Sequence, residues 1–424
     1  MTKENIIFEN NLLTCKSYIN KFSSEFYDEI DSKAADIDLN SKINDLFDGK
    51  QVNCTENLGA WHPKYRSTYK SDNSNEKYID IFQSATNVVS IGIGGSFEGP
   101  KLLIECAGNT TKNYVFITGS DIQEFSEKIN DLDKKETIFV VSSKSFKTDE
   151  TIQILQNAIH WSGNINKFIA ITSNKPEAQK YDIENIIEFD KEIGGRYSIW
   201  SDISLVAEWE NKTELKDSFM SGGLKADRDL RNNEEYYKFV KRLSYCDIWL
   251  NNSKNTESRA VLSYIWKFRS LPNYIQQLEM ESLGKKPRNE TEFQKTGQII
   301  FGGYGPRAQH SYFQLLHQGT QNICADIIAC QKDSKSLAYA QAITQSQLLS
   351  NGVNDIFLDE ERINGNIPLN LFLVNDEDAK TLGYLIATWE HRTYITAALL
   401  GINPYDQFGV NAGKFYTKKY LSDI

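Results

Sequence analysis

The sequence predicts an α/β protein built from two domains with parallel sheets, with helical segments at both ends of the chain. Short apolar runs alternate with stretches of helical pattern, as expected when parallel strands are joined by crossover helices. The chain also has 424 residues, of which 40% are hydrophobic, so it exceeds one compact domain and can build two sizeable cores.

Four apolar runs in the first half are each followed by polar or helical sequence, and we expect buried strands at 88–91, 114–117, 137–141 and 167–171. A polar, acidic stretch at about 210–235, which contains Gly222 and Gly223, is expected to separate the two halves. In the second half the pattern predicts strands at 298–301, 322–325 and 370–374, and helices at 334–350 and 376–399.

The first 75 residues are mostly polar, with helical patterns, and we expect them to pack on the domains as a cap. The chain therefore divides into an N-terminal helical cap at 1–75, a first domain at 76–225, and a second domain at 226–424 that ends in a helical segment.

Composition excludes several classes of protein. A net charge of −10 argues against a nucleic-acid partner, because a phosphate backbone favours a basic surface. The N-terminus lacks the basic start and apolar core of a signal peptide, and no segment approaches the roughly 18 apolar residues of a membrane span. We therefore expect a soluble, cytoplasmic protein without a membrane partner. The cysteines agree with a reducing compartment, since they show neither a C-x-x-C pair nor a zinc-binding spacing: Cys15, Cys54, Cys106, Cys246, Cys324 and Cys330.

The first chemical motif, at 91–100, places several glycines directly after a predicted strand. Glycines let a backbone approach a ligand, and the start of the following helix offers free N–H groups to an anion. A dinucleotide fingerprint would need glycine at Phe97, and a P-loop would need lysine at Pro100. Two interpretations remain: a site for a small anionic or hydroxylated ligand, or a tight strand-to-helix turn.

A second motif, at 142–150, offers four hydroxyl groups between a predicted strand and a predicted helix. Such a junction, with Lys144 beside it, suits one phosphate group. The alternative is an ordinary helix cap, but capping needs only one hydroxyl. The motif therefore favours phosphate.

A third motif, at 275–285, puts two amides and two carboxylates in a segment that otherwise reads as buried. A side chain such as Glu281 stays there only when its charge is used, either in proton chemistry or in a satisfied structural network. In the Gly194–Ser198 segment, two glycines before Arg196 could present a fixed guanidinium to an oxyanion. A surface turn with an exposed arginine is the alternative.

Two further motifs contain candidate acid–base groups. On a helix at 309–319, His310, Gln314 and His317 would share one face, although this spacing without a carboxylate ligand is not a metal site. In the segment 406–414, Lys414 could also simply cap a helix end.

Taken together, these motifs resemble the glucose-6-phosphate isomerase family. Six segments occur in the same order and context as the motifs of that family: I-G-I-G-G-S, S-K-S-F-K-T, G-G-R-Y-S, Q-Q-L-E-M-E-S, Q-H-S-Y-F-Q-L-L-H-Q-G and D-Q-F-G-V-N-A-G-K. Residues 53–57, with His62 and Arg66, also resemble the N-terminal motif of that family. The resemblance covers about residues 50–415, and several motifs in order are far more specific than any one.

The resemblance implies two sugar-isomerase (SIS) domains, with the active site between them and completed by the partner subunit of a homodimer. It implies interconversion of glucose 6-phosphate and fructose 6-phosphate through a cis-enediol(ate), without a metal or cofactor. Glu281 would transfer the proton, Arg196 would stabilise the enediolate, and His310 of the partner subunit would open the ring together with Lys414. The substrate-binding residues implied are Gly95, Ser96, Ser143, Lys144, Ser145, Thr148 and Gln277.

The sequence also departs from the family pattern. Lys147 replaces threonine in the phosphate loop, Leu283 replaces asparagine, residues 306–308 replace Thr-Asn-Gly, and residues 411–412 replace Glu-Leu. No departure removes a group with an assigned role, but they bear on phosphate-loop geometry, rate and sugar preference. The chain is also short for the family, so we expect some helices or loops to be missing.

Two other hypotheses fit the same motifs. A dual glucose/mannose 6-phosphate isomerase would be revealed by turnover of mannose 6-phosphate. A sensor that binds a sugar phosphate without converting it would need no base, so the joint presence of Glu281, Arg196, His310 and Lys414 counts against it.

Overall fold

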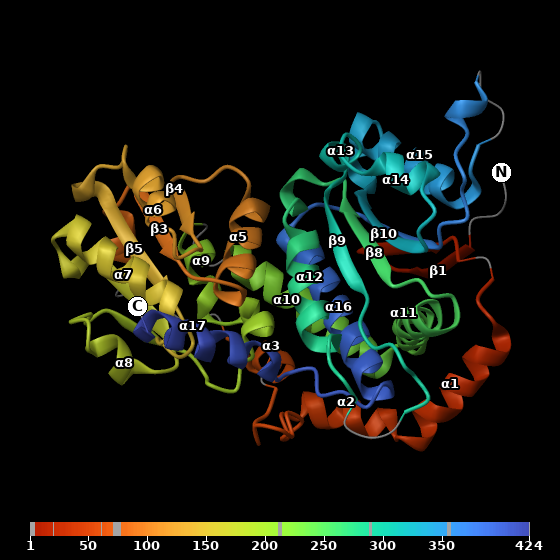
Figure 1. Ribbon diagram of the computed structural model, residues 1–424, viewed down its shortest axis with the longest axis horizontal. Coiled ribbons are helices and arrows are strands. Elements are labelled where there is room, and N and C mark those ends of the chain that lie inside the picture. Colours follow the sequence, from red (N-terminus) through yellow and green to blue (C-terminus); the bar gives the residue numbers. More distant parts are fainter. Residues whose placement is uncertain are drawn as a thin grey trace.

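The computed structural model describes residues 5–19, 21–60, 62–70, 78–210, 214–287, 291–353 and 358–423. Two sheets lie side by side, and helices α10 (Glu214–Asn232), α12 (Leu271–Leu283) and α16 (Ala379–Leu399) stand between them (Figure 1). This is the predicted α/β architecture with two parallel-strand cores. Within the described residues, no helix combines the length and low polarity needed to cross a bilayer. The cytoplasmic location stays a prediction.

The first sheet is entirely parallel and has the strand order β4-β3-β5-β6-β7. Its central strands are buried along their whole length, as expected for a sheet covered by helices on both faces. The strands are β3 (Asn87–Ile91), β4 (Asn113–Ile117), β5 (Thr137–Ser142), β6 (Phe168–Thr172) and β7 (Ile186–Glu188). The helices around it are α4 (Ile79–Gln83), α5 (Gly95–Ala107), α6 (Ile122–Ile129), α7 (Asp149–Ser162), α8 (Lys175–Gln179) and α9 (Leu205–Glu210).

The second sheet has the order β1-β2-β11-β10-β8-β9. Four of its strands are parallel: β8 (Ser258–Ser263), β9 (Ile299–Tyr304), β10 (Ile323–Cys330) and β11 (Leu369–Val374). Its other helices are α11 (Glu234–Ser253), α13 (Gly305–Ala308), α14 (Phe313–Gln318) and α15 (Leu337–Asn351), whereas α17 (Asn411–Asp423) lies beside the first sheet (Figure 1). The sequence did not predict β8, because the buried cation Arg259 interrupts its apolar run.

The N-terminal region differs from the expected helical cap. It begins with β1 (Asn5–Glu9) and β2 (Leu13–Ser17), which extend the second sheet in the antiparallel sense through the pairing of β2 with β11. Only then do α1 (Ser24–Asp36), α2 (Leu39–Phe47) and α3 (His62–Thr68) follow, and Figure 1 shows α1 and α2 along the base of the second domain. The boundaries at 75 and 225 stay predictions.

The described residues of the stretch at 210–235, which exclude 211–213, do not form a separating loop. Residues 214–232 form α10, which packs closely on α16. A Cβ on Gly222 would lie 1.9 Å from the carbonyl oxygen of Lys380, and a Cβ on Gly383 would lie 2.1 Å from that of Phe219. These glycines therefore allow two helices to pack closely. In the sequence alone, the pair Gly222 and Gly223 resembles a flexible linker.

Candidate active site

Helix α12 presents Glu281 and Gln277 on one face, one turn apart. Pro272 lies in the first turn of the helix, and Ile275 and Leu278 bury the opposite face in the core. The Nε2 of Gln277 donates to Oε1 of Glu281 at 3.1 Å. The Glu281 side chain keeps 36% of its surface exposed, so the carboxylate is fixed at one oxygen yet remains accessible.

Arg196 reaches the same carboxylate from the first domain. Its buried guanidinium donates from Nη1 to Oε2 of Glu281 at 3.0 Å, and from Nη2 to the carbonyls of Tyr405 and Asp406 at 3.0 and 2.7 Å. The hydroxyl of Tyr274 donates to the Arg196 carbonyl at 3.1 Å. The arginine is therefore held by both domains, and the alternative of an exposed surface turn is wrong.

The glycines beside these groups allow close approach. A Cβ on Gly95 would lie 1.8 Å from the carbonyl oxygen of Gly195, so the start of α5 touches the turn that carries Arg196. Gly94 has φ 58°, and a Cβ there would come within 2.9 Å of Nε2 of Gln277. Ser96 follows in the first turn of α5, half-buried. The glycine motif and α12 therefore form adjacent walls.

Residues 143–148 form the junction between β5 and α7. Ser143 Oγ accepts from the Phe146 N–H at 3.1 Å and lies 3.3 Å from Thr148 Oγ1. Thr148 precedes α7 without capping it through its side chain, so the first N–H groups of that helix remain available to an anion. Ser145 Oγ accepts from the N–H of Lys147 at 3.2 Å.

The two lysines of this loop differ. Burial lowers the pKa of Lys144, against the opposing effect of Glu56, Asp190 and Glu192. Lys147 instead extends outward, with Nζ 3.5 Å from Oε2 of Glu177 and 62% of its side chain exposed.

The loop at 403–406 supports Arg196 and is itself held by Lys285 and Asn403, for which no role was predicted from the sequence. Lys285 donates to the carbonyls of Asn403 and Asp406, both at 2.6 Å, and burial lowers the pKa of this lysine. Asn403 Nδ2 donates to Oδ1 of Asn53 at 2.8 Å, which joins the N-terminal motif to the loop. These groups act largely through backbone carbonyls, for which a sequence carries no signal.

His62 and Arg66 of the N-terminal motif lie in a buried network behind the site. The His62 ring stacks on Tyr197, with centroids 4.5 Å apart, and burial lowers the pKa of His62 well below its usual value. Arg66 donates to Asp227 at 2.7 and 2.6 Å and to Glu390 at 2.6 Å, while burial raises the pKa of Glu390 to about 7.

The side chains of the other two catalytic candidates are exposed, and neither forms a hydrogen bond or ion pair with this cluster in the described part of the chain. His310 is exposed in the turn between α13 and α14, so the predicted shared helix face with Gln314 and His317 is wrong. His317 instead contacts Oε1 of Gln345 at 2.8 Å. Lys414 lies exposed in the first turn of α17, beside the first domain (Figure 1). On the same helix, Lys418 pairs with Asp149 at 3.1 Å, which places α17 next to the start of α7.

Comparison with known proteins gives a consistent result. A sequence model of the phosphoglucose isomerase family matches residues 63–424. A glucose-6-phosphate isomerase from Shewanella sp. (strain MR-4) is 32% identical over 483 aligned positions, which cover 98% of this chain and 89% of that protein. Another from Shewanella putrefaciens is 32% identical over 471 positions, which cover 96% of this chain and 86% of that protein.

Solved structures share the fold. A glucose-6-phosphate isomerase from Chlamydia trachomatis aligns with a TM-score of 0.87 and 24% identity, over 98% of this chain and 89% of that one. A tagatose-6-phosphate ketose/aldose isomerase from Escherichia coli aligns with a TM-score of 0.54 and 10% identity, over 82% of this chain and 95% of that one. At these identities the likeness shows the fold alone.

The fold is that of SIS-type phosphosugar isomerases, as the sequence predicted. The chain belongs to the phosphoglucose isomerase family. The predictions of this family and of an aldose–ketose isomerase are thereby confirmed.

Proposed function

We propose that this chain interconverts glucose 6-phosphate and fructose 6-phosphate by ring opening and proton transfer through a cis-enediol(ate). The observation that carries the proposal is the Glu281 carboxylate, half-exposed between Gln277 and the buried Arg196. Moving a proton on a carbon next to a carbonyl requires a base and a group that stabilises the developing oxyanion. This pair supplies both from the residues of the chain.

Glu281 takes the proton from one carbon of the bound sugar and returns it to the next. Gln277 fixes one carboxylate oxygen, which orients the other towards the guanidinium. Arg196 holds its position through backbone carbonyls that do not change charge, so its guanidinium can shift its interaction from Glu281 to the enediolate oxygen. Such a preorganised cation needs little rearrangement as charge develops.

The substrate phosphate binds at residues 143–148, against the first turn of α7. The hydroxyls of Ser143, Ser145 and Thr148 lie in this loop, and Lys144 supplies a partly buried positive charge. Gly95 and Ser96 line the wall between the loop and α12. A remote anchor of this kind keeps the sugar in place while both carbons use the same carboxylate.

Ring opening uses His310 of the partner subunit together with Lys414, so the active unit is a homodimer. The exposure of His310 supports a role across an interface. The segment that carries Lys414 also exposes large apolar side chains that a second copy would cover: Phe408, Val410, Phe415, Tyr416, Tyr420 and Leu421.

A coupled assay with fructose 6-phosphate, following the appearance of glucose 6-phosphate, tests the reaction. We expect turnover of this substrate to exceed that of mannose 6-phosphate. Equal turnover of both sugars would identify a dual isomerase, and tight binding without conversion would identify a sensor.

Mixing two inactive variants, His310→Ala and Glu281→Gln, tests the shared site. Heterodimers would contain one intact site and one site lacking both residues. Random exchange in an equal mixture makes about half of the dimers mixed, so about a quarter of the normal activity should return. No recovery after verified exchange would mean that each chain supplies its own histidine.

A further inference from the structure

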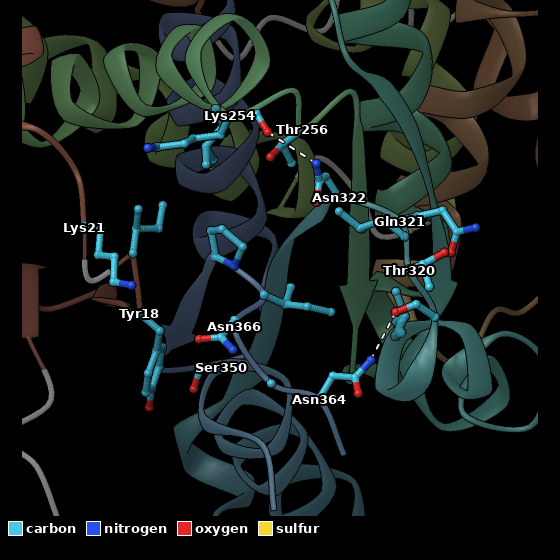
Figure 2. A pocket seen from close by; sticks show the side chains of 18 of the residues that line it. Tyr18, Lys21, Lys254, Thr256, Thr320, Gln321, Asn322, Ser350, Asn364 and Asn366 are labelled. Atoms are coloured by element: carbon cyan, nitrogen blue, oxygen red, sulfur yellow. Dashed lines mark hydrogen bonds between the residues drawn. The ribbon is translucent and has the colours of Figure 1, made fainter. Parts of the chain in front are cut away.

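A cavity lies in the second domain, at the amino ends of its parallel strands. Thr256, Asn322 and Pro368 line it and directly precede or adjoin the starts of β8, β10 and β11. The cavity has a volume of about 640 Å³, which is within the usual range of small-molecule sites. Figure 2 shows its polar side chains arranged around the opening.

This cavity is separate from the cluster around Glu281. Two of its walls come from α14 and α15, including Leu316, which packs in the core on the face of the sheet formed by Ala260 and Leu262. Helix α12 packs on the opposite face, where Val261 points. The cavity also reaches the α12 side of the sheet, because Trp249 of α11 and Lys254 directly after this helix line it, but the two sites share no lining residue among those described.

The charge of the cavity is opposite to that of the protein. Its described lining includes Lys21 and Lys254 but no Asp or Glu, although the chain has 57 acidic and 47 basic residues. Both lysines are exposed, and neither forms an ion pair with another described residue. They lie on the same side of the opening in Figure 2. Two unneutralised ammonium groups at one opening favour an anion.

Lys254 is also held near the opening by its surroundings. Its Nζ lies 4.9 Å from the centroid of the Trp249 ring, and its carbonyl accepts from Nδ2 of Asn322 at 3.5 Å. Trp249 is almost fully buried, so it gives the lysine a fixed platform. The cation is therefore less free than an ordinary surface lysine.

The remaining lining suits the body of a small organic molecule. The apolar residues Leu316, Ile323 and Pro368 form part of the wall, while Thr320, Gln321 and Asn364 lie on the side of the view opposite Lys21 (Figure 2). Asn364 Nδ2 donates to the Gly319 carbonyl at 3.1 Å, which leaves its side-chain oxygen available. An apolar wall with a few amides and hydroxyls is the usual composition of a ligand site.

We propose that this cavity is a second ligand site, for a phosphorylated metabolite with a ring body, whose phosphate binds Lys21 and Lys254. Lysine binds phosphate as a compact point charge, and the amides and hydroxyls of the opposite rim bind the hydroxyls or ring edge. Because the cavity shares no described lining residue with the cluster around Glu281, its ligand binds without competing with the substrate.

The test is isothermal titration of the full-length protein with AMP, ribose 5-phosphate and inorganic phosphate, with and without saturating fructose 6-phosphate. We expect AMP or ribose 5-phosphate to bind more tightly than inorganic phosphate, in the presence as well as the absence of fructose 6-phosphate. The double variant Lys21→Gln/Lys254→Gln should weaken this binding roughly tenfold, since each exposed ion pair contributes up to about 1 kcal/mol. Its isomerase activity without added ligand should be unchanged.

Lys335→Gln is the matched control, because Lys335 is an exposed lysine of the same domain outside the cavity. It should leave binding intact. The proposal is overturned if none of the three probes binds at millimolar concentration, if fructose 6-phosphate displaces them, or if inorganic phosphate binds as tightly as the ring compounds. Unchanged binding in the double variant would overturn it equally.

Discussion

Two arginine–carboxylate clusters each include a glutamate of α12. The two glutamates are two residues apart in the sequence, but their surroundings differ. Glu279 is buried against Arg259, inside a network in which Arg259 and Arg392 both donate to Asp247, at 2.7 and 2.6 Å. Glu281, two residues later, meets Arg196 but keeps 36% of its side chain exposed. Residue type alone therefore does not distinguish the two glutamates.

The difference shows how the same pair of residue types can serve stability or chemistry. The Glu279 network joins β8, β10, α11, α12 and α16, because Arg392 also donates to Asp326 at 2.8 Å. Burial raises the pKa of Glu279, despite the lowering effect of Arg259. A closed network of this kind has no access to a substrate. Arg196 is also buried and donates to two backbone carbonyls, but the carboxylate of Glu281 remains accessible to a substrate.

Substituting the open glutamate should have the largest effect. Glu281→Gln keeps the shape of the side chain and removes the base, so we expect kcat to fall by about 10² to 10⁴-fold, as is typical when a general base is lost. Substrate binding, measured by calorimetry, should persist. Near-normal turnover would assign the proton transfer to another group.

Substituting the closed glutamate should instead reduce stability. Glu279→Gln removes one partner of a buried cation, and we expect the free energy of unfolding in denaturant to fall by roughly 3 kcal/mol. Glu281→Gln, by contrast, should change it by less than about 1 kcal/mol, since Arg196 keeps its carbonyl partners. Equal destabilisation by both variants would remove the distinction between the clusters.

The phosphate loop should affect affinity more than rate. Ser145→Ala and Thr148→Ala should mainly raise KM, because these hydroxyls hold the ground state and the transition state alike. Lys147→Thr is the matched control, since its side chain points towards Glu177 and is exposed. It should change steady-state kinetics little. Loss of binding in Lys147→Thr, or failure of inorganic phosphate to compete with the substrate, would contradict this assignment.

The smallest expected effect is on the pH dependence of stability, through His62 in the buried network behind the site. Burial lowers the pKa of His62 in the folded protein, so the imidazole is protonated at a higher pH in the unfolded chain than in the folded one. The free energy of unfolding therefore falls as the pH drops below about 6.5. One proton contributes about 1.4 kcal/mol per pH unit. His62→Phe, which keeps a ring against Tyr197, should flatten this slope in denaturant unfolding at pH 5 to 7. An unchanged slope would mean that His62 is protonated in the folded protein.

The sequence predicted much of the fold, because buried parallel strands leave continuous apolar runs, as at β3, β5 and β6. It failed where a local pattern is overridden by tertiary contacts. Gly222 and Gly223 look like a linker yet lie in α10, and the N-terminal strands gain their stability from pairing with β11. His310 was assigned to a helix, but α14 begins only at Phe313.

The residues of the candidate site could be proposed from the sequence because most of them lie in short local motifs, and their roles stay predictions. Glu281, Arg196 and the 143–148 loop each lie in a short motif with its own chemical meaning, although only the fold brings Glu281 and Arg196 into contact. Lys285 and Asn403 had no such meaning in isolation, because Lys285 acts largely on backbone carbonyls and Asn403 on a distant turn. Contacts of this kind leave no pattern of residue types along the chain.

Solvent isotope exchange during turnover tests the role of Glu281 most directly. In deuterium oxide, the wild-type protein should introduce deuterium at the carbon that receives the proton, because a carboxylate base exchanges its proton with solvent. Glu281→Gln should bind fructose 6-phosphate with a similar Kd but introduce deuterium at least about 10²-fold more slowly. Exchange by Glu281→Gln at the wild-type rate would contradict the account.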